Sequence, residues 1–215
     1  MALRVNWRWK GSGRGMPALI KTRIVACGVF EDVLGHLELT RRYPGVQISY
    51  LPANLHTRPA QLEQRLAVEL GGSPRGNERT ICLYGECCPN INELCEQHGA
   101  IKVPGEHCYQ MLLGGRRFAE LMAETAGTYF VEKQLIVNFR EHCVEPLELD
   151  DEEMRKCFFQ HYSRLLYVRQ PWDPELVPRA AELAEFLEMG LQVEDADYSC
   201  LDAVLKDLIE GESGR

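Results

Sequence analysis

The chain has 215 residues, 45% of them hydrophobic, and a net charge of -8 at pH 7. That length fits one large domain with a substantial core. The negative charge argues against a general nucleic-acid binder, because non-specific affinity for the phosphate backbone comes mainly from Lys and Arg. No stretch approaches the roughly 20 apolar residues that a membrane helix needs. We therefore expect a cytoplasmic protein that binds neither nucleic acid nor membrane.

The N-terminal segment differs in composition from the rest of the chain. Residues 4–14 hold the main basic cluster, together with Trp7 and Trp9. No apolar core of signal-peptide length follows these basic residues. We expect residues 1–21 to form a disordered leader, and residues 22–212 to form a single α/β domain.

Strand-like and helix-like segments then alternate along the chain. Buried or alternating apolar runs predict strands, and 3.6-residue periodicity predicts helices. The expected strands are residues 24–27, 46–51, 80–84, 101–103, 128–131, 165–168 and 191–193. The expected helices are residues 31–42, 59–70, 90–98, 108–123 with a break at Gly114-Gly115, 134–143, a segment from the acidic run 149–153 to 162, 174–189 and 199–210. This alternation predicts Rossmann-like βαβ units, with an open, mostly parallel sheet and helices on both faces.

Two of these helices carry recognisable end signals. Pro59 can begin its helix, since the missing amide proton of proline costs nothing in the first turn. Ser199 and Asp202 have the spacing and residue types of a capping box at the start of the last helix.

Nine cysteines are distributed over the chain. A secreted protein would use them for disulfides, but this chain is long, shows no secretion signal and has an odd number of them. Reduced thiols are therefore expected. Some will be small buried hydrophobes, and others can be ligands or nucleophiles.

Three cysteines follow predicted strands. Cys27 ends the first strand, Cys87 follows the third, and Cys108 follows the fourth. Ligands of open α/β sheets bind at the carboxyl ends of the strands, so these thiols are expected to converge although they lie far apart in sequence. Three converging thiolates suit a soft metal or an iron–sulfur cluster. The turn after Cys27 also places this thiol at a helix N-terminus, which would lower its pKa.

Two neighbours of these cysteines are reserve ligands. Cys88 directly follows Cys87, but adjacent side chains point in different directions, so Cys87 is the preferred ligand. His107 precedes Cys108 and could bind a metal directly or hydrogen-bond to one of its ligands. His56 and Arg58, in the loop after the second strand, are weaker candidates for binding an anionic substrate. The remaining cysteines are interpreted as structural.

A set of short motifs, none specific alone, occurs in a characteristic order. The motifs are Cys27-Gly28, residues 55–59 (Leu-His-Thr-Arg-Pro), residues 84–87 (Tyr-Gly-Glu-Cys), Cys108 with residues 112–114 (Leu-Leu-Gly), and residues 127–130 (Gly-Thr-Tyr-Phe). Together they resemble the domain-of-unknown-function family numbered 1638, over roughly residues 24–209. Its three strand-end cysteines correspond to Cys27, Cys87 and Cys108. The resemblance implies no assigned activity, but members are often encoded near corrinoid-dependent methyltransferase systems.

The chain departs from the family at two of these sites. The family tends to have His-Asp-Cys where this chain has Glu-His-Cys at residues 106–108, and Gly where this chain has Cys88. These extra potential ligands could mark a different metal centre or a specialised member.

Several functions fit these observations. The first is an iron–sulfur protein, with a 4Fe-4S cluster held by Cys27, Cys87 and Cys108, in a redox or cofactor-handling role beside a redox or corrinoid protein partner. The second is a zinc–thiolate protein for metal delivery or methyl transfer. The third is a metal-free thiol protein, in redox or cysteine-dependent catalysis. The fourth is a binding module with its cysteines in the core. Whether the protein is an enzyme stays open.

Overall fold

The computed structural model describes residues 21–72 and 78–211, and seven strands in this part of the chain form two all-parallel sheets. The larger sheet has the order β2-β1-β3-β4, and the smaller has the order β5-β6-β7. The strands are β1 (Lys21–Cys27), β2 (Val46–Leu51), β3 (Glu78–Leu83), β4 (Ala100–Lys102), β5 (Thr128–Val131), β6 (Arg164–Arg169) and β7 (Gly190–Asp195). The predicted α/β class is confirmed, while the strands divide between two sheets instead of continuing in one.

Helices connect these strands as a parallel sheet requires. The helices are α1 (Glu31–His36), α2 (Leu39–Arg42), α3 (Pro59–Leu70), α4 (Ile91–Gln97), α5 (Cys108–Leu113), α6 (Gly115–Glu124), α7 (Lys133–Phe139), α8 (Glu152–Phe159), α9 (Val177–Phe186) and α10 (Ser199–Glu210). Short 3-10 turns lie at η1 (Gly28–Phe30), η2 (Ala53–Thr57) and η4 (Pro174–Leu176), and a π-helical turn at η3 (Arg140–Val144). No helix in the described ranges is long and apolar enough to cross a bilayer.

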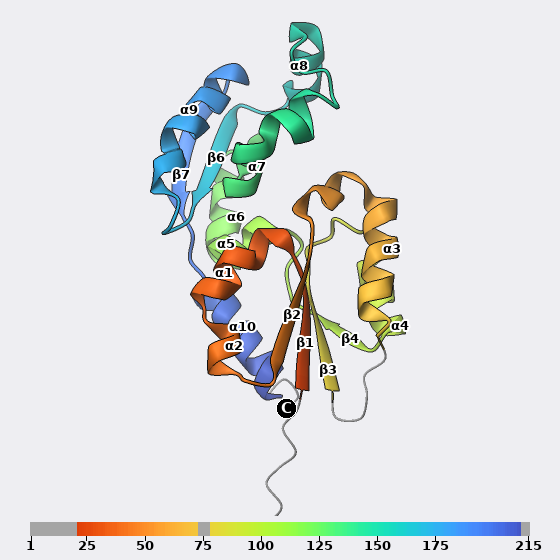
Figure 1. Ribbon diagram of the computed structural model, residues 1–215. Coiled ribbons are helices and arrows are strands. Elements are labelled where there is room, and N and C mark those ends of the chain that lie inside the picture. The colour runs from red at the N-terminus through yellow and green to blue at the C-terminus, as the bar shows by residue number, and fades with distance from the viewer. Residues whose placement is uncertain (1–20, 73–77, 212–215) are drawn as a thin grey trace, which may run out of the picture.

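Helices cover both faces of the larger sheet. Successive residues of a strand point to opposite faces, so Ile24 and Val25 of β1 enter different cores. Figure 1 shows α3 and α4 on one side of this sheet, and α1, α2 and α10 on the other. The α3–α4 side buries Leu62 and Leu66 against the sheet.

One core spans both sheets. Ile24 of the larger sheet and Leu166 of the smaller sheet belong to the same cluster of buried apolar side chains, which also includes Leu205 of α10. The other face of the smaller sheet packs against α7 and α9, where Leu183 is buried. The chain thus finishes by returning from the smaller sheet to pack against the larger one (Figure 1).

Two local predictions need correction, and a third lies almost wholly outside the described residues. The helix expected over residues 31–42 divides into α1 and α2, because Glu38 adopts a left-handed backbone conformation (φ 50°). Ser199 and Asp202 do not form a capping box: Asp197 accepts the Ser199 N–H at 2.9 Å. Asp202 instead pairs with Arg42 across 2.6 Å. The leader predicted over residues 1–21 lies outside the described residues except for Lys21, where β1 begins.

Candidate metal centre

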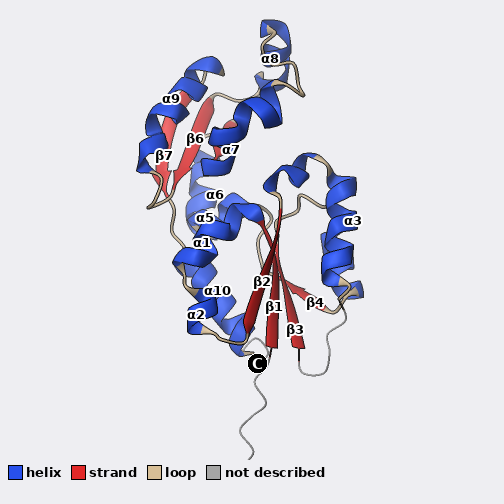
Figure 2. Cartoon of the chain, viewed as in Figure 1, coloured by secondary structure: helices blue, strands red, loops and turns tan. Residues whose placement is uncertain are grey.

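A cavity of about 160 Å³ lies where the carboxyl ends of the two sheets face each other. Its walls combine residues that follow β1 and β3 with the first residues of α5 and α7. In Figure 2, α7 lies between the smaller sheet and the end of the larger one. This is the place at which ligands of parallel α/β sheets bind.

Cys27, Cys87 and Cys108 all line this cavity. They come from β1, from the turn after β3 and from the first position of α5, so three separate segments supply one sulfur each. The sulfurs also influence each other electrostatically, since Cys27 and Cys87 both raise the pKa of Cys108. The structure therefore brings together the three cysteines that the strand-end argument selected. We call this the cysteine cavity.

Burial keeps these sulfurs in the thiol form when no cation is present. It raises the pKa of Cys27 to about 12, although a hydrogen bond from the Val29 N–H opposes the increase. Burial likewise raises the pKa of Cys87, and it raises that of Cys108 well above the usual value for a thiol. The lowered pKa expected for Cys27 from a helix N-terminus is wrong, because η1 is a single 3-10 turn and loss of hydration dominates.

Gly85 allows two of the sulfur-bearing loops to meet. A side-chain carbon added at Gly85 would lie 2.6 Å from the carbonyl oxygen of Glu106. The loops are joined there by a hydrogen bond of 2.7 Å from the Glu86 N–H to the same oxygen. The absence of a side chain at residue 85 therefore brings the Cys87 turn close to the segment that begins with Glu106 and leads into Cys108.

Glu132 is an acidic group in the cavity wall that the sequence argument missed. Its side chain is 2% exposed and accepts the backbone N–H groups of Gln134 at 2.8 Å and Leu135 at 3.0 Å, capping α7. Burial raises the pKa of Glu132 to about 7, against the effect of these two hydrogen bonds. Its carboxyl group can therefore exchange a proton near neutral pH. Because Glu132 directly follows β5, the strand-end rule would have identified it.

Three histidines also line the cysteine cavity. His107, the predicted reserve ligand, is placed there and packs against Phe118 with 5.7 Å between ring centroids. His56 reaches it from η2, and its Nδ1 lies 2.6 Å from the Ala53 carbonyl oxygen. His142 comes from the π-helical turn η3 and was not predicted as a site residue, because an isolated helical histidine carries no distinguishing pattern.

Cys88 does not reach the cavity. It is fully buried in the core on the α3–α4 side of the sheet, in the same cluster as Cys82 and Cys95. The interpretation of Cys88 as a reserve ligand is therefore corrected. Adjacent residues point to different sides of the turn, so only Cys87 faces the cavity.

Tyr84 gives the cavity an unpartnered polar group. It lines the cavity, is only 2% exposed, and lies beside Cys27. Its hydroxyl group is near enough to the Cys27 sulfur to lower the pKa of that thiol, but it has no hydrogen-bond partner of good geometry within the described residues. A buried hydroxyl without a partner is costly, so the cavity fits a bound group that would supply one.

The possible metal ligands of the cavity are not arranged as a finished metal site. Over residues 21–72 and 78–211, no group of three or more His, Cys, Asp or Glu side chains is arranged so that it could hold a metal ion. The sulfurs share a cavity, but their present positions do not form a finished site for a single ion.

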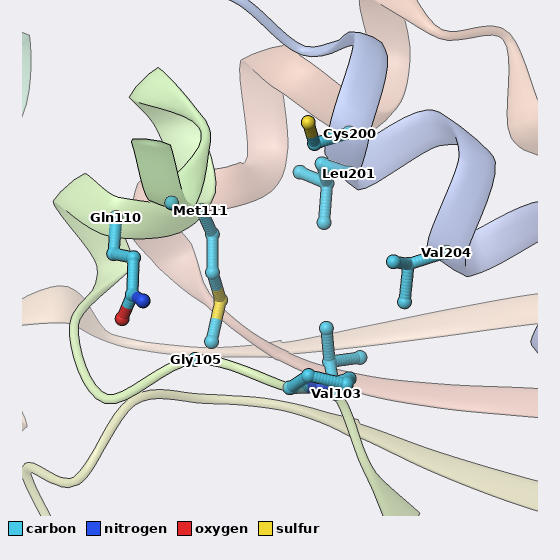
Figure 3. A pocket seen from close by; sticks show the side chains of 9 residues that line it. Val103, Gly105, Gln110, Met111, Cys200, Leu201 and Val204 are labelled. Atoms are coloured by element: carbon cyan, nitrogen blue, oxygen red, sulfur yellow. The ribbon is translucent and has the colours of Figure 1, made fainter. Parts of the chain in front are cut away.

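A different pocket, between α5 and α10, lacks the group of thiols and histidines found in the cysteine cavity. Figure 3 shows Gln110 and Met111 on one side of it, and Leu201 and Val204 on the other. Its lining is mainly apolar and shares no residue with the cysteine cavity. Cys200 is an isolated thiol there, so this pocket offers no comparable chemistry.

The fold and the cavity together define an α/β protein with a thiol-lined site between two parallel sheets. The chain belongs to the family described as protein of unknown function (DUF1638), whose model matches residues 50–205. Cys87 and Cys108 lie inside the matched range, and Cys27 precedes it. The predicted family is thus confirmed, with a match that starts later than residue 24. No curated protein and no solved structure matches the chain.

Proposed function

We propose that the protein binds an iron–sulfur cluster, most simply of the 4Fe-4S type, through Cys27, Cys87 and Cys108. The observation that carries the proposal is that three thiols from three distant segments line one cavity, beside the unpartnered hydroxyl of Tyr84. Cysteine thiolates are the usual ligands of such clusters. A bound cluster would supply electron transfer or, at an iron without a protein ligand, Lewis acidity.

The surrounding residues would hold and shield this group. Tyr84 would donate a hydrogen bond to it, and such bonds to sulfur tune the redox potential of a cluster. Binding would displace the thiol protons, because only thiolates are ligands. Glu132 lies in the same wall and could accept one of these protons.

Zinc is the second candidate. In a tetrahedral site, sulfurs about 2.3 Å from the ion lie only about 3.8 Å apart. No such ready arrangement is present in the described part of the chain, so zinc binding would require the loops to close further. A cluster places its own iron and sulfide atoms between the cysteines and suits more widely spaced sulfurs.

A metal-free thiol enzyme is supported less well. Nucleophilic cysteines have a lowered pKa, usually beside a cation or a helix N-terminus. Burial instead raises the pKa of all three cavity cysteines. The fourth interpretation, a binding module with core cysteines, fits Cys88 but not the three thiols that line the cavity.

We propose a redox or cofactor-handling role in the cytoplasm, with a redox or corrinoid protein as partner. All nine cysteines are free thiols, which supports a reducing compartment. The corrinoid partner rests on the family resemblance.

The test is anaerobic purification followed by iron and sulfide analysis, with visible absorbance spectra. We expect stoichiometric iron and sulfide in the wild-type protein, and loss of both in Cys27→Ala, Cys87→Ala and Cys108→Ala. The exposed Cys157 and Cys200 serve as controls, because neither lines the cavity. Far-UV circular dichroism checks folding. Zinc without sulfide would favour the second candidate, and metal retained in any one variant would remove that cysteine from the ligand set.

A further inference from the structure

A second cavity, of about 410 Å³, adjoins the cysteine cavity. Asn54, His56 and His142 line both, so the two spaces share a wall of three side chains. The second cavity is also lined by Thr57, Arg58, Tyr129, Glu141, Cys143, Pro146 and Leu147. A small molecule held in the second cavity would therefore lie next to the three thiols.

Arg58 is an exposed cation that lines the second cavity alone. Its guanidinium group makes no hydrogen bond or ion pair with any residue that the structure describes, whereas Arg41 and Arg42 both pair with carboxylates. Arginine binds carboxylates through two parallel hydrogen bonds. Nearby, the Nδ1 atom of His56 is engaged with the Ala53 carbonyl oxygen, so its Nε2 is the nitrogen left for a ligand.

Two backbone elements border the second cavity near its polar side chains. The 12-residue helix α3 begins directly after Arg58, with no acidic residue in its first turn and no side-chain cap. The Gln61 and Leu62 N–H groups of its first turn already bond to the Arg58 carbonyl oxygen, so the helix end adds only a weak positive potential near Arg58. The π-helical turn η3 supplies His142 to the lining of both cavities, and turns of this kind recur at functional sites.

The remaining lining restricts the kind of anion. Glu141 adds a negative charge to the same cavity, which disfavours ligands with several negative charges. Pro146 and Leu147 supply an apolar wall beside Tyr129. The cavity therefore offers one guanidinium group, one carboxylate of opposite charge and an apolar surface. This lining fits a ligand that has a single carboxylate and a short apolar body.

We propose that the second cavity binds the carboxylate end of a small monocarboxylate substrate through Arg58, and that its other end reaches the cysteine cavity past His56 and His142. Its role as a substrate rests on the proposed cluster function, because the reacting group would lie at the cysteines. Binding of the carboxylate itself does not depend on the cluster.

The test uses sodium butyrate as the probe, titrated into the full chain and followed by NMR. We expect Arg58→Gln to raise the dissociation constant of butyrate at least tenfold. Arg58→Lys, which keeps the charge but not the paired donors, should raise it less. The control is Arg65→Gln, on the exposed surface of the same helix, which should leave it unchanged. Inorganic phosphate and pyrophosphate are titrated in parallel and should bind more weakly than butyrate.

Two results would overturn the inference. Butyrate affinity unchanged in both Arg58 variants would show that Arg58 is not the carboxylate site. Tighter, Arg58-dependent binding of pyrophosphate would reject the monocarboxylate class. Iron and sulfide content separates this inference from the cluster proposal. Arg58-dependent butyrate binding in a protein without iron would reject only the cluster, and an iron-containing protein without such binding would reject only the carboxylate site.

Discussion

At the scale of single residues, the cysteine cavity depends as much on a missing side chain as on the sulfurs. Cys87 and the segment leading to Cys108 approach each other because Gly85 leaves room for the carbonyl oxygen of Glu106. The cysteines could be selected from sequence by their positions after strands. The close approach at Gly85 could not, because it depends on a loop about 20 residues away in the chain.

Gly85→Ala should weaken both the fold and the site. The added carbon would lie 2.6 Å from a backbone oxygen, a contact that only a backbone shift can relieve. We expect a loss of about 1–3 kcal/mol in the free energy of unfolding, typical of overpacking, and a lower iron content. Urea denaturation and metal analysis measure the two effects.

Gly35→Ala is the matched control for this substitution. Gly35 lies in α1, and an added carbon there would meet nothing within 4 Å. Alanine favours the helix over glycine, by roughly 0.5–1 kcal/mol. The control should therefore be as stable as the wild type or slightly more stable. Equal stability and iron content in the two variants would show that the approach at Gly85 is unimportant.

At the scale of elements, the segment after β6 contains a buried acid with an unusual environment. Asp173 is fully buried, and its Oδ1 accepts the Gln170 N–H at 2.7 Å. Its Oδ2 has no partner among the described residues. Burial raises the pKa of Asp173 above the usual value for aspartate. The ionised form is therefore disfavoured in the folded protein.

Because its pKa is raised, Asp173 makes the folded protein less stable as pH rises. Above pH 3.8 the unfolded state loses the proton of Asp173 before the folded state does, so this group makes the protein less stable as pH rises through that window. Asp173→Asn should remove this dependence and raise the stability at neutral pH. Thermal unfolding from pH 4 to pH 8 measures it.

Asp195→Asn provides a control of opposite sign. Arg169 pairs with Asp195 across 2.7 Å and lowers its pKa. The contribution of Asp195 to stability is present above the unfolded pKa and disappears as pH falls through the lower, folded pKa. Its replacement should therefore slightly reduce stability at neutral pH. If Asp173→Asn instead lost stability at neutral pH, the ionised Asp173 would stabilise the folded protein, contrary to the prediction above.

The sequence predicts the positions of the strands but not how they pair into sheets. Local patterns located the seven strands found within residues 21–72 and 78–211, because buried apolar runs and the turn residues that bound them are local properties. They did not divide the strands between two sheets, since strand pairing is non-local. The split between α1 and α2 at Glu38 was also missed, because a left-handed glutamate has no sequence signature. Glu132 was missed although it obeys the rule that selected the cysteines.

At the scale of the whole molecule, the two sheets share a core. Leu205 of α10 lies in the same cluster as Ile24 of the larger sheet and Leu166 of the smaller sheet. A core that spans two sheets should make them unfold together, as expected of one domain. The cysteine cavity lies between the sheets, so separate unfolding of either sheet would open it.

This cooperativity can be tested with two matched substitutions. Leu205→Ala removes a fully buried side chain from the shared core, whereas Leu183→Ala changes a core that belongs to the smaller sheet alone. Each should cost about 2–5 kcal/mol. If the protein is one cooperative unit, native-state hydrogen exchange should show equal destabilisation of the β1 and β6 amides in both variants. Destabilisation of β6 without β1 in Leu183→Ala would instead show two domains, and the cysteine cavity would then be a site that forms only when they meet.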